Sequence, residues 1–445
     1  MQAHNRHYWL KSGSLNLILN IQSLVFSFGG FFLLVRILDK HSFGIWTLFI
    51  ATTTIFETAR TGLMQSALIK FLSSTKNEEH PEVLSASFFI SGVLMIACII
   101  IIISIAGYLS RVWHYPRLVN MFYAYNIVYI LLGVLSQLQW IEQAHLSFSG
   151  TVVTNIIRQG GFFAYVLFCF LSKLDVSLMS LVYAQAACAL AAMMVEYFFV
   201  RQHLYFLFKV PKQWVLKLFN YGKYAFGTFI SYILSNTINQ MMLGAMISAE
   251  AASVYNVALR ITNAADIPTN AVGSIVFPQS ARRFAEQGNQ AGKYMYEKSV
   301  GTVLALLIPV LVFVLIFPHF IVHVIAGDKY ADAIPILRIT VATCVLNPFQ
   351  RLFGTIMDSM GKPKINFVMI LFFTAINLAL NFPFIKAYGI MGAVYATLIA
   401  DVIFIMVQVI ILRRKFNVNV LNPFVYAVKF YPEFFNSYIK PRLKR

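Results

Sequence analysis

The chain has 445 residues, of which 59% are hydrophobic and 12% charged, and its mean hydropathy is +0.71. Soluble domains hold roughly 45–50% apolar and about 25% charged residues, so this composition excludes a soluble fold. The formal net charge of +18 would suit a nucleic-acid partner if the cations formed one stripe. They are instead spread over many loops, which disfavours a nucleic-acid-binding protein.

Long apolar segments follow one another along the chain at spacings that fit membrane-spanning helices. Uncharged runs such as 12–35, 83–110 and 365–385 reach the roughly 20 residues that a spanning helix needs. The first run is too long for a signal peptide and lacks a small-residue cleavage site, so it is predicted to stay as an anchor. The predicted spans cover residues 14–35, 44–68, 84–106, 120–140, 153–172, 177–200, 222–247, 253–278, 300–325, 333–356, 365–385 and 391–412.

The distribution of lysine and arginine predicts the orientation of these spans. With the N-terminus inside, most cations fall in cytoplasmic segments, as they do in multi-pass proteins generally. The outer segments would hold only Arg36, Lys40, Arg111, Arg117, Lys173, Lys329 and Lys386. Both termini are therefore predicted to face the cytoplasm.

An internal repeat divides the chain into two related halves. Gly13 aligns with Gly222, Trp46 with Tyr255 and Glu57 with Asp266, at one constant offset. Six spans per half is an even number, so both halves enter the membrane from the same side, which is typical of a parallel repeat in a transporter. The predicted fold is an all-α integral membrane protein of about twelve helices, in two six-helix bundles around a central cavity. The predicted domains are residues 1–205, a cytoplasmic linker at 206–221, a second bundle at 222–412 and a basic cytoplasmic tail at 413–445.

Three segments carry a family resemblance: LVRILDKHSFGIWTLF at 34–49, NQMMLGAMISAEAASVYNVALRI at 239–261, and the long run from GKPKINF to TLIADV at 361–402. Residues 10–412 resemble the polysaccharide-exporter branch of the multidrug/oligosaccharidyl-lipid/polysaccharide (MOP) flippase superfamily. The resemblance implies a MATE-like fold whose two bundles form a V. It also implies a Wzx-type flippase, without enzymatic activity or cofactor, in the bacterial inner membrane.

The resemblance further implies the cargo and the partners. The cargo would be a polyprenyl-diphosphate-linked oligosaccharide, such as a repeat unit of O-antigen or lipopolysaccharide, which passes from the inner to the outer leaflet by alternating access. The partners would be this lipid-linked oligosaccharide, the membrane lipids and the polysaccharide polymerase or assembly machinery.

Charged residues inside the predicted spans are the candidate functional residues, because an ionisable group in the bilayer is costly unless it serves a purpose. A guanidinium group is permanently charged and binds phosphate oxygens through two donors at once. The candidate diphosphate ligands are Arg60, Arg260, Arg338 and Arg351. Candidates for ion coupling or charge pairing are Glu57, Asp266 and Asp401.

Each candidate also has a structural interpretation. Glu57 and Arg60 are three residues apart on one helical face and could neutralise each other. Arg260 and Asp266, six apart, each need a partner from elsewhere, whereas Arg338 and Arg351 could extend to the two membrane surfaces. Asp401 has no cation within four residues, which leaves a proton or sodium site open.

Other sequence features carry less weight. Pro268, two residues beyond Asp266, is the candidate hinge because proline interrupts helix hydrogen bonding. The four cysteines lie inside spans without CxxC spacing, so no disulfide or metal site is predicted. His319 and His323, four apart, could share a metal, although interfacial packing is the favoured interpretation. Arg158 and Glu196 are assigned to the cytoplasmic interface.

Two rival functions remain open. A MATE-type exporter of organic cations would share the fold, but its cavity should be dominated by acids. A membrane glycan polymerase or glycosyltransferase would act on the same lipid carrier, but such enzymes usually need a sizeable outer loop, and none much exceeds 107–119.

Overall fold

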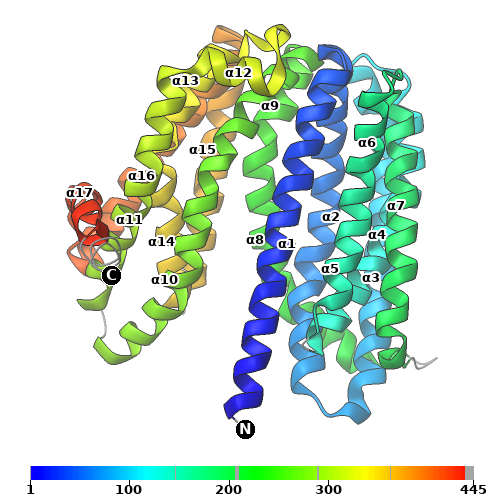
Figure 1. The fold of residues 1–445 in the computed structure, drawn as a ribbon. Coiled ribbons are helices and arrows are strands. Elements are labelled where there is room, and N and C mark those ends of the chain that lie inside the picture. The colour runs from blue at the N-terminus through cyan, green and yellow to red at the C-terminus, as the bar shows by residue number, and fades with distance from the viewer. Residues whose placement is uncertain (1, 146, 206–209, 288–289, 361, 436–445) are drawn as a thin grey trace, which may run out of the picture. The chain divides into compact units, whose positions relative to one another are not determined.

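The computed structural model describes residues 2–145, 147–205, 210–287, 290–360 and 362–435, and within these residues all regular structure is helical (Figure 1). Helices suit a chain of this composition because each one satisfies its own backbone hydrogen bonds in lipid. The first half contains α1 Gln2–Ile37, α2 Lys40–Ser74, η1 Asn77–Glu79, α3 His80–Val112, α4 Leu118–Ala144, α5 Ser149–Asn155, η2 Ile156–Gly160, α6 Gly161–Leu171, α7 Leu178–Val200 and η3 Arg201–His203.

The second half is also helical and more often interrupted. It contains α8 Lys212–Met246, α9 Ala249–Thr262, η4 Asn263–Ala265, α10 Asp266–Gln287, α11 Gln290–Ile316, α12 Pro318–Ala326, η5 Asp328–Tyr330, α13 Ala333–Thr343, α14 Asn347–Ser359, α15 Pro363–Tyr388, α16 Ile390–Phe416 and α17 Asn422–Phe434. The predicted all-α membrane fold is confirmed.

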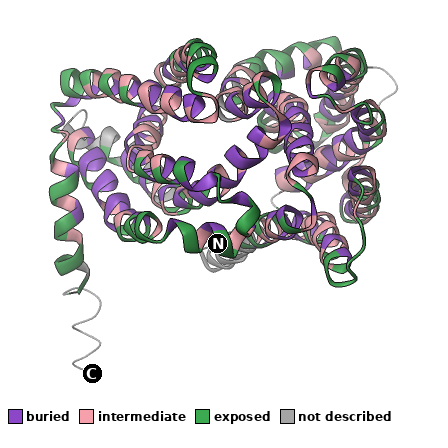
Figure 2. Ribbon diagram, turned by 90° about the horizontal axis from the view of Figure 1, so that it is seen from above, coloured by how far each residue is buried: buried purple, intermediate pink, exposed green. Residues whose placement is uncertain are grey.

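Seven described helical segments are long and apolar enough to cross a membrane, and α13 with α14, bent by 45°, would make an eighth. The other predicted spans correspond to α1, α2, α8 and the broken pair of α9 and α10, which carry more polar and charged residues. Exposed residues lie along many helices (Figure 2). Many of them are large and apolar, such as Ile96 (59% exposed) and Leu171 (70% exposed). Such a surface is stable in contact with lipid.

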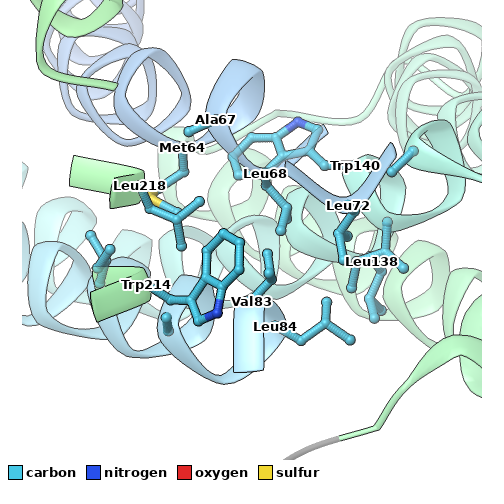
Figure 3. Packing of buried hydrophobic residues seen from close by; sticks show 14 of the residues in the cluster. Met64, Ala67, Leu68, Leu72, Val83, Leu84, Leu138, Trp140, Trp214 and Leu218 are labelled. Carbon is cyan, nitrogen blue, oxygen red and sulfur yellow. The ribbon is translucent and has the colours of Figure 1, made fainter. Parts of the chain in front are cut away.

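The first of two compact units comprises residues 1–234. Within it α4 packs against α2, α3 and α7. A buried apolar cluster joins these helices and includes Met64 and Leu68 of α2, Leu84 of α3 and Leu138 of α4 (Figure 3). The cluster therefore fixes the helix arrangement around α4.

The beginning of α8 belongs to this first unit. Trp214 and Leu218 lie in the same apolar cluster, and α8 passes so close to α2 that a Cβ on Gly222 would lie 2.0 Å from the carbonyl oxygen of Leu63. The compact units divide at 234/235, inside α8, and the bundles predicted on either side of a linker at 206–221 stay a prediction. Part of that predicted linker is helical, since α8 begins at Lys212, and residues 206–209 lie outside the described residues.

The second unit comprises residues 235–445. In it α10 packs against α11 and α14, α15 against α16, and α13 against α9. The predicted tail contains α17, which packs along α11: Asn422 Nδ2 donates to Glu297 Oε2 (2.8 Å), and the Tyr431 hydroxyl donates to the Ala305 carbonyl (2.6 Å). Residues 436–445 of that tail lie outside the described residues. The described part of the tail is thus anchored on the second unit.

Asp39, in the turn between α1 and α2, caps the N-terminus of α2 by accepting the backbone N–H of Ser42 (2.9 Å). Partial burial raises the pKa of Asp39, but hydrogen bonds from Ser42 and His41 outweigh burial and lower the pKa from 3.8. Because the folded-state pKa lies below the unfolded value, the stabilisation is complete above the unfolded pKa and is lost as the pH falls through the folded pKa.

Asp39→Ala should lower the melting temperature of the detergent-solubilised protein, since losing a cap costs about 1 kcal/mol. Asp39→Asn, which keeps an acceptor oxygen, is the matched control and should melt closer to wild type. The difference between wild type and Asp39→Ala should persist at neutral pH and shrink below about pH 3.8. An unchanged difference in strong acid would contradict the carboxylate cap.

Candidate functional site

The guanidinium group of Arg60 is buried in the first unit and held by α4. Its Nη1 donates to the Tyr129 carbonyl (3.0 Å), and its Nη2 donates to the Leu132 carbonyl (3.3 Å) and the Ser136 hydroxyl (3.4 Å). The guanidinium also lies 4.9 Å from the centre of the Tyr129 ring. Gly133 provides the space, because a Cβ there would lie 2.8 Å from Nη1. Only 2% of Arg60 is exposed, so in this conformation it serves helix packing.

Glu57 lies one turn before Arg60 and is held by the same neighbouring helix. The Tyr125 hydroxyl donates to Glu57 Oε1, and the Tyr129 hydroxyl donates to the Phe56 carbonyl (3.2 Å). The sequence left open an ion pair between Glu57 and Arg60. Among the described residues no salt bridge joins them, because both side chains point to α4 and each finds a separate partner there.

Arg158 joins this group, although the sequence analysis assigned it to the interface. It lies in the π-helical turn Ile156–Gly160 between α5 and α6, donates to Asn155 Oδ1 (3.2 Å), and is close enough to Glu57 and Tyr125 for electrostatic interaction. The apolar residues around Arg158 in the sequence are compatible with an arginine in the protein interior and with one at the interface, so the sequence did not distinguish the two.

Glu142 and Glu196 form a second polar centre of the first unit that the sequence did not predict. Glu142 accepts the backbone N–H groups of Gly150 and Thr151, both at 2.7 Å, and so compensates the positive end of α5. Glu196, expected at the interface, is fully buried and accepts the Thr154 hydroxyl (2.7 Å). Glu142 therefore fastens the turn between α4 and α5, and Glu196 joins α7 to α5.

In the second unit the structure brings two predicted residues together. Arg351 Nη1 of α14 lies 3.5 Å from Asp266 Oδ2 at the start of α10, with both side chains half-buried. Asp401 of α16 is 7% exposed and accepts a hydrogen bond from Gln350 Nε2 (2.9 Å). Adjacent residues of α14 therefore bind the two candidate coupling acids.

A neutral hydrogen-bonded network lies on α8, α9, α15 and α16 of the second unit. Asn239 Nδ2 donates to the hydroxyl groups of Tyr255 (3.0 Å) and Thr397 (2.7 Å), and Asn381 Nδ2 donates to Asn239 Oδ1 (2.8 Å). Asn377 Nδ2 reaches Thr397 at 3.3 Å. All three asparagines are buried, so the network ties four helices together without charge. Asparagines four apart in an apolar run were its only sequence signal.

The remaining candidates are Arg260, Arg338 and Pro268. Arg260 is half-buried near the end of α9, and Arg338 is exposed on α13. Pro268 lies in the first turn of α10, directly after the break at Asn263–Ala265. Proline is tolerated there because the first-turn N–H groups have no helical acceptor. Its role as a hinge stays a prediction.

Among the described residues, no group of three or more His, Cys, Asp or Glu side chains is arranged to hold a metal ion. His323 Nδ1 contacts Asp328 Oδ1 at 2.5 Å, and both side chains are exposed. The free cysteines are Cys98, Cys169, Cys188 and Cys344. The candidate residues described above therefore interact through hydrogen bonds and ion pairs.

Gly133→Ala should destabilise the protein, because the new methyl group would displace a guanidinium held by three hydrogen bonds. Overpacking of this kind costs about 1–3 kcal/mol, measurable as a lower melting temperature. Gly92→Ala in α3 is the matched control, since a Cβ there meets nothing within 4 Å, and it should be neutral or stabilising. Equal melting temperatures for the two variants would argue against a fixed Arg60.

A double-mutant cycle should reveal the coupling of Asp266 and Arg351. Asp266→Asn and Arg351→Gln each leave one half-buried charge without its partner, so the destabilisations of the two single variants should together exceed that of the double variant. Thermal unfolding of all four proteins gives the interaction energy, expected at about 1 kcal/mol for a half-exposed pair. Strict additivity would mean that the 3.5 Å contact is not maintained.

Comparison with known proteins supplies the family. The profile of the polysaccharide biosynthesis protein family matches residues 9–284, and the MatE profile matches residues 224–382. A probable low-salt glycan biosynthesis flippase, Agl15 of Haloferax volcanii, is 25% identical over 386 residues, which is 85% of this chain and 78% of that protein. Two uncharacterized membrane proteins of Methanocaldococcus jannaschii match shorter stretches, and this chain covers 41% and 25% of their lengths.

Solved structures share the fold. The lipid II flippase MurJ in an inward closed conformation superposes with a TM-score of 0.76 at 14% identity, covering 95% of this chain and 92% of that one. An inward-facing MATE multidrug transporter of the MOP superfamily gives 0.73 at 14% identity, covering 88% and 94%. The chain belongs to the polysaccharide biosynthesis protein family, as the resemblance in its sequence predicted.

Proposed function

We propose that this protein is a flippase that carries a polyprenyl-diphosphate-linked oligosaccharide from the inner to the outer leaflet of a cell membrane. The observation that carries the proposal is the presence of permanently charged guanidinium groups inside the membrane-spanning part of a chain of the polysaccharide biosynthesis family. A diphosphate leaving the headgroup layer needs cationic donors, and guanidinium groups supply them without depending on pH. The name of the Haloferax relative and the fold of the lipid II flippase agree with this cargo class.

The proposed arginines differ in exposure. Arg338 is exposed on α13 and is the candidate first contact for a diphosphate, and Arg260, half-buried near the end of α9, is a further candidate ligand. Arg60 and Arg351 are engaged with α4 and with Asp266. They would have to exchange these partners for phosphate during a conformational change, so we assign them to transient states of the transport cycle.

The transport cycle would be alternating access of two six-helix bundles, with Pro268 beside the break between α9 and α10 as one hinge. Asp266, Asp401 and Glu57 are the proposed sites for proton or sodium coupling, because each carboxylate lies in a membrane span and contacts side chains of a neighbouring helix that it could exchange for an ion. Both termini would face the cytoplasm. The named curated relatives are archaeal, so we place the protein in a plasma membrane instead of specifically the bacterial inner membrane.

The wider pathway is likewise proposed. An O-antigen or other lipopolysaccharide repeat unit would be the cargo in a bacterial host, and a polysaccharide polymerase would take it over at the outer leaflet. Flippases and transporters move cargo without covalent chemistry, so the glycan polymerase considered from the sequence is not retained.

A MATE-type exporter is the second candidate, favoured by the MatE profile over residues 224–382. Such an exporter would bind organic cations through acids. In this chain two of the acids that would do so, Asp266 and Asp401, already have partners on α14. The two functions predict cargo of opposite charge, which makes them separable.

Deletion of the gene in its host should leave lipid-linked oligosaccharide on the cytoplasmic leaflet, measured by accessibility to an added impermeant glycosidase or lectin. Wild type should restore outer-leaflet delivery, and Arg260→Gln should restore it poorly, because a guanidinium–phosphate contact is worth roughly tenfold or more in affinity. Arg111→Gln, at the outer end of α3, is the matched control and should restore delivery fully.

Normal delivery in the deletion strain, together with greater sensitivity to cationic drugs, would favour the exporter. For the coupling sites, transport should lose its pH or sodium dependence in Asp266→Asn or Asp401→Asn. A dependence that survives in both variants would remove these two acids from the coupling mechanism.

A further inference from the structure

The π-helical turn Ile156–Gly160 interrupts the membrane span formed by α5 and α6. A π-turn inserts one residue into a helix and recurs at functional sites in proteins, because it costs stability that a purely structural helix would avoid. Arg158 is the cation of this turn and is half-buried. The interruption therefore sets a permanent charge within a span.

The hydrogen bonding of Arg158 leaves most of its donors unused. A guanidinium has five N–H donors, and within the described part of the chain Arg158 makes one hydrogen bond, from Nη2 to Asn155 Oδ1 at 3.2 Å. Asn155 is itself oriented by Gln159 Nε2 (3.3 Å) and by donating to the Thr151 carbonyl (2.9 Å). One N–H group of the guanidinium is thus engaged, while the others can donate hydrogen bonds to a ligand.

The charge of Arg158 is balanced at a distance instead of by contact. Glu57 interacts with it electrostatically, but the Tyr125 hydroxyl donates to Glu57, and no salt bridge joins Glu57 to Arg158 among the described residues. Glu57 lowers the cost of holding the cation in the span without occupying its donors. A phosphate group could therefore bind without displacing a carboxylate.

Two other arginines of the spans lack this freedom. Arg60 makes three hydrogen bonds to α4 and is 2% exposed, and Arg351 faces the carboxylate of Asp266. Arg338 is exposed on α13 and has no comparable burial to strengthen an ionic contact. Arg158 combines partial burial with unused donors, the two properties that an anion-binding guanidinium requires.

We propose that Arg158 is a phosphate-binding residue that receives the diphosphate group of the lipid-linked cargo, with Asn155 positioning the guanidinium and Glu57 compensating its charge between transport cycles. This inference rests on the proposed function for the identity of the cargo. Its physical core, an anion site at the π-helical turn, is independent of that identity and can be tested with inorganic pyrophosphate.

The test uses the purified full-length protein in phosphatidylcholine nanodiscs. Affinities are measured for undecaprenyl diphosphate and for undecaprenol, which differs by lacking the diphosphate, and thermal stabilisation is measured with inorganic pyrophosphate. The variants are Arg158→Gln and Arg158→Lys. Arg201→Gln, which removes an exposed arginine at the end of α7, is the matched control for net charge.

Wild type and Arg201→Gln should prefer undecaprenyl diphosphate to undecaprenol, and pyrophosphate should stabilise both. Arg158→Gln should weaken diphosphate binding by about tenfold to a hundredfold and abolish the pyrophosphate effect, because a charge-assisted contact is lost. Arg158→Lys keeps the charge but loses the bidentate geometry and should fall between them. It also serves as the readout if Arg158→Gln does not fold.

The failures are distinguishable. If diphosphate binds Arg158→Gln and Arg158→Lys as tightly as wild type, the inference is overturned while the proposed function stands. If pyrophosphate stabilises wild type but not Arg158→Gln, and undecaprenyl diphosphate is not preferred, the anion site is supported and the lipid-linked cargo is rejected. If neither ligand acts on wild type, both proposals fail.

Discussion

An arginine inside a membrane span stays protonated, so its charge must be compensated by groups of the surrounding helices or by a bound anion. This constraint organises the interior of both units. In the first unit it is met by α4, which offers two backbone carbonyls, a hydroxyl and an aromatic ring to Arg60. The contact requires Gly133, because a side chain there would collide with the guanidinium of Arg60. The compensation of this charge therefore depends on the close packing of α2 against α4.

The two halves meet the same constraint with different residues. Glu57 and Asp266 occupy equivalent positions of the repeat, and the fourth span of each half, α4 or α13 with α14, is also equivalent. In both halves the acid binds that fourth span, through Tyr125 in the first and Arg351 in the second. The duplicated scaffold thus preserves which helices meet, while the chemistry of the contact has diverged.

This divergence bears on function. The carboxylate of Glu57 is bound by the neutral phenol of Tyr125, and the equivalent carboxylate of Asp266 is bound by the cation of Arg351. Protonation of the acid would therefore break an ion pair only in the second unit. In the first unit the guanidinium of Arg158 makes one hydrogen bond, whereas the second unit contains a neutral asparagine network beside the ion pair of Asp266 and Arg351. We expect anionic cargo and coupling ions to act on different groups for this reason.

Composition and hydropathy were sufficient to predict an all-α membrane protein, because span length and apolar content are local properties of the chain, and three sequence segments supplied the family resemblance. Composition and hydropathy also located most of the intramembrane charges, since such residues stand out against their neighbours.

Partners across helices could not be predicted from the sequence. Glu57 and Arg60 looked like a pair, yet each binds α4, and Asp266 contacts Arg351, which lies many residues away in the sequence. The tertiary structure alone decided these pairings, placed the start of α8 in the first unit through Trp214, Leu218 and Gly222, and brought Arg158 near Glu57. Contacts of this kind depend on which helix faces meet, and a one-dimensional pattern does not record that.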